Sequence, residues 1–218
     1  MVSNSNFQLL QPEAAEYLTP TKKLRRLAIL LTIHGDPQTS QHKIAAACSL
    51  SSSMVNNYIK QLHNAGLISI SGANNRCQQY HLTEAGQKKL MQSLLEYSAE
   101  IIQMYSSAKQ ELCLRLRSMV DEGIKDVILF GAAETAEVVC TAIRDTPLRI
   151  AAIIDSDPHK QGTPFNGHTI QPPETLRTLQ ADAVVITSFG KQQDIHRTIK
   201  KIAGSGTHIK MLAELEAH

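Results

Sequence analysis

The amino-acid sequence predicts an α/β protein built from a small helical domain that ends in a β-hairpin, a long helix, and a small parallel-sheet domain. Three observations support this fold class. Amphipathic helices and two short strands fill the chain up to Leu82, no proline or glycine occurs from Gln87 to Glu122, and apolar strands alternate with helices after Ile124. The predicted domains are therefore residues 1–83, 84–122 and 123–218.

The composition is that of an ordinary globular protein, with 42% hydrophobic and 19% charged residues among 218. No apolar run approaches the roughly 20 residues needed to span a bilayer. The first residues lack the basic segment and apolar block of a secretion signal. We therefore expect a cytoplasmic protein with no membrane partner.

The cysteines give no sign of a metal site. Cys48, Cys77, Cys113 and Cys140 form no CxxC pair and no zinc pattern with the nine histidines. We expect reduced thiols and no metal, and a redox-sensing pair of cysteines remains an alternative.

Charge is distributed unevenly, although the net charge is only +2. Through Leu82 the chain has seven Lys or Arg residues against three Asp or Glu, whereas the remainder has fifteen against seventeen. This asymmetry favours a polyanionic partner for the first domain only.

The first domain is predicted to contain three helices and a hairpin. Apolar residues recur at helical spacing from Leu24 and stop at Gly35, and a short amphipathic helix follows, capped by Thr39 or Ser40. A third helix ends near Gly66. Two strands then alternate, at 67–71 and 76–83, with Tyr80 and Leu82 directed inward in the second.

The third helix has one aliphatic and one polar face. Val55, Ile59 and Leu62 fall on the first, and short hydrogen-bonding side chains with one lysine fall on the second. Three helices followed by a hairpin form a winged helix-turn-helix, whose third helix presents such side chains to base edges in the major groove. We expect the asparagines to read adenine, the serines to hold a phosphate at the helix N-terminus, and the lysine and wing residues to contact phosphate or the minor groove. The predicted DNA-binding residues are Ser51, Ser52, Ser53, Asn56, Asn57, Lys60, Asn74, Asn75 and Arg76.

A family resemblance agrees with this interpretation. The stretch LSSSMVNNYIKQLHNAGLI from Leu50, followed by YHLTEAG, resembles the winged-helix domains of bacterial MarR-type transcriptional regulators over about Leu24 to Gly86. The resemblance implies transcriptional regulation through double-stranded DNA. Such helices often carry an arginine near Asn57, where this one has only Lys60, and the basic cluster from Lys22 to Arg26 could compensate. The alternative is a winged helix used only for protein contact.

The segment 84–122 is predicted to form one or two long helices. Its apolar residues are spaced like the seam of a coiled coil. They are Leu90, Leu94, Tyr97, Ile101, Met104 and Ala108. Because neither flanking domain offers an obvious partner for so long a seam, we expect two copies of the helix to pair in a homodimer. The alternative is a helix packed on its own domain.

The last domain is predicted to be a small parallel sheet covered on both faces. The turn after its first strand reads GAAETA from Gly131, where a dinucleotide-binding loop reads GxGxxG, so only the first glycine is kept. Asp155 ends the second strand, where an acid can accept hydrogen bonds from a ribose diol, and Thr187 follows the third strand at the carboxyl edge. The predicted ligand-binding residues are Gly131, Ala133, Glu134, Thr135, Asp155, Ser156, Asp157, Thr187, Ser188 and Phe189.

Two families resemble this domain over about Ile124 to Leu212. The sequence DSDP from Asp155, with Lys160, Gly162 and Gly167 after it, is similar to the Rossmann domain of Rex-type redox-sensing repressors, which bind NAD(H). It is also similar to the small N-terminal domain of bacterial sugar acetyltransferases and related sugar-nucleotide proteins. These resemblances imply a Rossmann-like domain whose effector is a nucleotide-type metabolite, either NAD(H) or a nucleotide sugar.

Catalysis is not predicted. No serine or cysteine lies in a nucleophile elbow, and no carboxylate pair or histidine cluster is set by local spacing. We therefore expect a DNA-binding transcriptional regulator, not an enzyme, with a metabolite-sensing Rossmann-like domain. The alternatives are a Rossmann-type enzyme or subunit in sugar-nucleotide metabolism, and a dimerising scaffold without a ligand.

Overall fold

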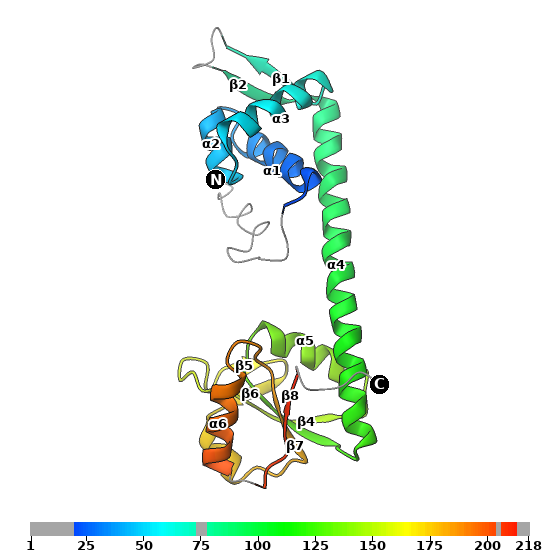
Figure 1. Cartoon of the computed structure of the whole chain (residues 1–218), viewed down its shortest axis with the longest axis vertical. Coiled ribbons are helices and arrows are strands. Elements are labelled where there is room, and N and C mark those ends of the chain that lie inside the picture. Colours follow the sequence, from blue (N-terminus) through cyan, green and yellow to red (C-terminus); the bar gives the residue numbers. More distant parts are fainter. Residues whose placement is uncertain (1–19, 73–77, 204–205, 213–218) are drawn as a thin grey trace. The chain divides into compact units, whose positions relative to one another are not determined.

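The computed structural model describes residues 20–72, 78–203 and 206–212. The chain divides into two compact units, Met1–Ile102 and Gln103–His218 (Figure 1). The predicted fold class is confirmed, with a winged helix first, a long helix next and a largely parallel sheet last. The boundary between the units falls inside the long helix, whereas the sequence-based division at 84–122 treats that helix as a separate segment.

The first unit has the expected order of elements. Helices α1 (Lys22–Gly35), α2 (Gln41–Ala47) and α3 (Ser52–Asn64) precede the antiparallel strands β1 (Ile68–Ser71) and β2 (Gln79–Leu82). Each helix begins after a residue whose side-chain hydroxyl accepts a backbone N–H of the first turn. These capping residues are Thr21, Ser40 and Ser51 respectively. Ser40 is therefore the cap of α2, while Thr39 is buried beside it.

An aliphatic core holds these elements together. Ile33, Ile44, Val55 and Ile68 are almost completely buried, and so is Tyr80 of β2. Leu82 is partly buried against the same cluster, so both inward-facing positions of β2 are confirmed. The helices thus bury their apolar stripes against one another and leave their polar faces in solvent.

Helix α4 is one continuous element, Glu84–Asp121. Near its start Leu90 is buried in the core of the first unit, and near its end Leu116 and Met119 are buried in the core of the second. The expectation that neither domain supplies a partner for this helix is therefore wrong at both ends. Its middle is different, because Ile102 and Tyr105 are exposed there.

The second unit is built on a six-stranded sheet. Its strands are β3 (Asp126–Phe130), β4 (Arg149–Ile154), β5 (Pro164–Phe165), β6 (His168–Gln171), β7 (Ala183–Ile186) and β8 (Ile209–Met211). They lie in the order β5-β6-β4-β3-β7-β8, and every neighbouring pair is parallel except β5 with β6. The chain first builds outward from β3 through β4 and then crosses to β7 on the other side of β3. This change of direction creates a topological switch point between β3 and β7.

Both faces of this sheet are covered, as predicted for apolar parallel strands. Val127 and Leu129 pack with the end of α4 and with α5 (Glu134–Ile143), whereas Ile128 and Phe130 pack with η3 (Pro173–Arg177) and α6 (Gln192–Ala203) (Figure 1). Element η3 is a short 3₁₀ helix of five residues.

The sequence interpretation missed the hairpin of β5 and β6. Asn166 and Gly167 join these strands with φ values of 49° and 84°. Two consecutive positive φ values are typical of the Asn-Gly turn that closes a two-residue hairpin.

Candidate functional site

Helix α3 presents the predicted polar face to solvent. Tyr58, Ile59 and Leu62 are buried, whereas Ser52, Asn57 and Lys60 are exposed. Asn56 is half-buried at the edge of the same face, and Ser53 is exposed. The structure therefore brings the predicted residues of α3 onto one accessible surface. Asn74, Asn75 and Arg76 of the wing lie outside the described residues.

Ser51 has a structural role that the sequence did not assign. Its hydroxyl oxygen accepts the backbone N–H of Met54 at 3.3 Å and lies 3.0 Å from the hydroxyl of Ser53. Ser51 is therefore the N-cap of α3. Among the described residues, Ser52 provides the hydroxyl nearest the start of the helix that has no hydrogen-bond partner.

The end of α3 is fastened to the start of α4. The hydroxyl of Thr83 donates to the carbonyl of Gly66 at 2.6 Å and accepts the N–H of Gly86 at 3.0 Å. A Cβ atom on Gly86 would lie 1.9 Å from the carbonyl oxygen of Leu67, so only glycine allows this close approach. Thr83 and Gly86, both in the stretch YHLTEAG, thus fix the position of the start of α4 against the segment that follows α3.

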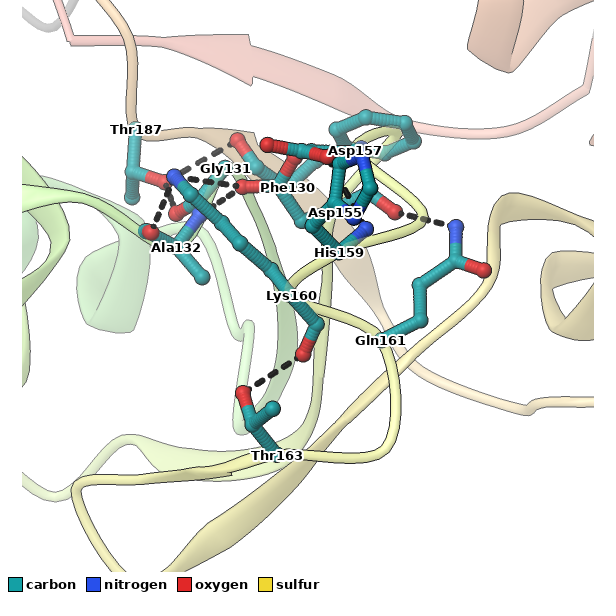
Figure 2. A network of polar contacts seen from close by, with 10 residues as sticks. All are labelled: Phe130, Gly131, Ala132, Asp155, Asp157, His159, Lys160, Gln161, Thr163 and Thr187. Atoms are coloured by element: carbon teal, nitrogen blue, oxygen red, sulfur yellow. Dashed lines mark hydrogen bonds and ion pairs between the residues drawn. The ribbon is translucent and has the colours of Figure 1, made fainter.

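In the second unit, Gly131 contacts both neighbours of β3, namely the end of β4 and the residue that follows β7, and Figure 2 shows its contact with Thr187. Gly131 has a φ of 113°, and its N–H donates to the carbonyl of Ile154 at 2.7 Å. The buried hydroxyl of Thr187 lies 2.6 Å from the carbonyl oxygen of Gly131, and a Cβ on Gly131 would lie 3.1 Å from that hydroxyl. Gly131 is therefore needed both for its backbone conformation and for its contact with β7.

Asp155 organises the loop after β3. One carboxylate oxygen accepts the N–H of Ala132 at 2.7 Å, and the other accepts the N–H of Asp157 at 2.9 Å. The ammonium of Lys160 donates to the carbonyl of Ala132 at 2.8 Å and lies 3.4 Å from the Asp155 carboxylate (Figure 2). The side chain of Asp155 is only 14% exposed. Both oxygens thus already accept hydrogen bonds within the protein, and the ribose contact stays a prediction.

The other predicted ligand residues line the same end of the sheet at different depths. Ala133 is the N-cap of α5 without a side-chain bond, and Glu134 and Thr135 begin the helix. Glu134 and Glu137 place two carboxylates in that first turn, which disfavours an anionic ligand at the helix end. On the loops, Ser156 and Phe189 are exposed and Ser188 is half-buried.

Lys160 and Gln161 belong to this network but were not among the predicted site residues. The side-chain amide of Gln161 donates to the carbonyl of Asp155 at 3.0 Å. Both residues lie in a polar loop with no periodicity. The contact of Lys160 with Ala132, 28 residues away, could not be found from local spacing.

The described cysteines are buried and poorly suited to redox sensing. Cys48, Cys113 and Cys140 are buried thiols in the two cores, and none of them belongs to a disulfide among the described residues. Burial raises the pKa of Cys48 to about 11 and also raises the pKa of Cys140. Because the thiolate is the reactive form, burial lowers the reactivity of these two thiols. Cys77 lies outside the described residues.

Two families match parts of the chain. A family described as winged helix-turn-helix DNA-binding matches residues 24–69, and one described as C2185-like, N-terminal, matches residues 123–210. The first match covers most of α1, all of α2 and α3 and the start of β1, so this part of the chain is similar to winged helix-turn-helix DNA-binding domains.

Solved structures of transcriptional regulators resemble parts of the chain. MosR of M. tuberculosis is 15% identical with a TM-score of 0.34, and the match covers 40% of this chain and 62% of MosR, which is less than two thirds of that protein. MepR of Staphylococcus aureus is 18% identical with a TM-score of 0.35, and the match covers 53% of this chain and 88% of MepR. No curated protein sequence matches significantly. Over the described residues, the structure holds no helix with the length and apolar character required to cross a membrane.

Proposed function

We propose that this chain is a DNA-binding transcriptional regulator that acts as a homodimer and senses a nucleotide-type metabolite. The observation that carries the DNA-binding proposal is the exposed polar face of α3 within a winged helix-turn-helix domain. A recognition helix needs a buried stripe to fix its position and short donor and acceptor side chains to read bases. Helix α3 has both.

Each predicted DNA-binding residue within α3 has a proposed role. The amide of Asn57, with Asn56 beside it, can donate to and accept from adenine in the major groove. Ser52 and Ser53 lie in the first turn, where free backbone N–H groups favour a phosphate. Lys60 supplies a phosphate contact that carries no sequence information.

A fluorescence anisotropy titration with a labelled duplex of about 30 base pairs and mixed sequence tests this proposal. At about 50 mM salt we expect binding by the full chain, because non-specific contacts dominate at low salt. Lys60→Gln should weaken binding and reduce the slope of log K against log salt by about 0.9 for one lost phosphate contact. Lys200→Gln on α6 removes the same charge from the other unit and should leave the DNA affinity and the salt slope unchanged. If the full chain does not bind DNA at this salt, the winged helix serves a protein partner.

The second unit is proposed to be the sensor. Ligands of open α/β sheets bind beyond the carboxyl ends of the strands at a topological switch point. Gly131 and Thr187 meet at that point, and Ala133, Glu134 and Thr135 follow Gly131 at the start of α5. Coupling would require the ligand to prefer one of two arrangements of the dimer.

Thermal unfolding with NADH, UDP-glucose and other nucleotides tests the sensing proposal separately. A ligand at about 100 times its Kd should stabilise the domain that binds it by about 2.7 kcal/mol. Stabilisation by NADH favours a redox effector, and stabilisation by UDP-glucose favours a nucleotide sugar. If no nucleotide changes the Tm, the second unit does not sense this class of metabolite.

A further inference from the structure

Helix α1 carries a row of basic side chains that ends beside the recognition helix. Lys22, Lys23 and Arg26 are exposed, and their spacing of three and four residues puts them on one side of the helix. The guanidinium of Arg26 donates to the side-chain carbonyl of Gln61 on α3 at 2.8 Å. This bond positions an α1 arginine against α3.

Gln61 lies at the flank of the proposed DNA-reading face. It follows Asn57 by four residues, which places the two side chains one above the other on α3, and it is next to Lys60. A helix in the major groove has a phosphate backbone along each rim of the groove. When α3 lies in a major groove, a guanidinium held beside Gln61 faces one rim of that groove.

These cations are not neutralised within the described parts of the first unit. The ion pairs found there join Lys43 to Asp36 and Lys88 to Glu84. Neither Lys22, Lys23, Arg26 nor Lys60 has a carboxylate partner among the described residues. Concentrated positive charge without an internal partner is typical of a surface that binds a polyanion.

We propose that the face of α1 formed by Lys22, Lys23 and Arg26, here named the basic strip, is a second phosphate-binding part of the DNA interface, with Arg26 on a rim phosphate. This inference rests on the proposed DNA binding by α3. A guanidinium has five N–H donors, and the bond to Gln61 uses one. The other four allow a bidentate hydrogen bond to a phosphate. Helix α3 contains no arginine, and α1 supplies one at its side.

The salt dependence of DNA binding tests the inference. The same duplex is titrated between about 50 and 200 mM salt with the full chain, Arg26→Gln, and the double variant Lys22→Gln/Lys23→Gln. We expect Arg26→Gln to weaken binding several-fold for every duplex sequence and to reduce the salt slope by about 0.9. The double variant leaves the Arg26–Gln61 bond intact and should reduce the slope by up to about 1.8. The matched control is Arg144→Gln, which replaces an exposed arginine of the second unit. It should change neither the DNA affinity nor the salt slope.

The outcomes separate the two proposals. If the full chain binds and Lys60→Gln weakens it, but Arg26→Gln and the double variant keep the full slope, the basic strip does not contact DNA and the proposed function stands. If the full chain does not bind, both proposals fail. A lower Tm of Arg26→Gln with an unchanged slope would show that the bond to Gln61 only joins the two helices.

Discussion

At the scale of single residues, the turn between α2 and α3 depends on Ser49. This residue has a φ of 51°, in the left-handed region that side chains with a Cβ adopt at a cost of roughly 1–2 kcal/mol. Glycine adopts the same conformation without that cost but loses more chain entropy on folding. We expect Ser49→Gly to stabilise the first unit by about 0.5–1 kcal/mol.

Hydrogen exchange of the buried amides of α1 and α3 in the full chain measures this change, because it reports the opening of one unit independently of the other. Ser53→Gly is the matched control. It introduces glycine into the first turn of α3, where helical φ is required, and should destabilise the same amides by up to about 1 kcal/mol. If both variants speed exchange, Ser49 is not strained.

Residues of the sheet edge show what sequence can and cannot identify. Gly131, Asp155 and Thr187 were predicted from their position just after apolar strands, and the structure brings them to one edge. The role of Asp155 could not be predicted in the same way. Whether its carboxylate faces a ligand or binds the N–H of Ala132 depends on how two loops meet. Lys160 escaped prediction for the same reason.

At the scale of elements, the start of α4 depends on Gly86. Glycine to alanine inside a helix normally stabilises it by about 1 kcal/mol, because alanine has the best helix propensity. At Gly86 the new Cβ would lie 1.9 Å from the backbone oxygen of Leu67, so either α4 or the segment between α3 and β1 must shift. We expect Gly86→Ala to destabilise the first unit by about 1–3 kcal/mol, the usual cost of overpacking.

Hydrogen exchange of the first-unit amides measures the effect of Gly86→Ala, and DNA titration measures its consequence for binding. Gly35→Ala is the control, since a Cβ at the last residue of α1 has no atom within 4 Å. That variant should be neutral or slightly stabilising. Equal behaviour of the two variants would mean that the approach of Gly86 to Leu67 is not tight in solution.

Elements with long periodic patterns were predictable, and short ones were not. Helical spacing of apolar residues located the buried stripes of α1 and α3. Continuous apolar runs located the strands β3, β4 and β7. Strand β5 has only two residues, too few for a period of two to appear. The Asn-Gly turn after it was the available signal, but it does not say that the strands belong to an otherwise parallel sheet.

At the scale of the whole molecule, α4 is the element that both cores share. The predicted seam begins at Leu90, and its first residues pack in the core of the first unit instead of facing a second helix. A neighbouring stripe along the same helix remains exposed: Leu95 by 66%, Ile102 by 64% and Tyr105 by 45%. Their spacing of seven and three residues continues a heptad-like pattern, which is typical of a surface that pairs with another helix. We therefore place the proposed dimer contact on this stripe.

The double variant Leu95→Glu/Ile102→Glu tests this placement. Burial of a leucine or isoleucine side chain contributes about 1.5–3 kcal/mol, so losing two from each helix should raise the dimer Kd by at least about 100-fold. Sedimentation equilibrium of the full chain over a range of concentrations measures that constant. The control is Leu114→Glu, which adds a charge at an exposed leucine on another side of α4 and should leave the dimer intact.

Because two linked winged helices bind DNA more tightly than one, the double variant should also lose DNA affinity although its α3 is unchanged. If the full chain is a monomer, or if the full chain and both variants have the same dimer Kd, the exposed stripe does not mediate self-association. A monomer would bind DNA through a single winged helix.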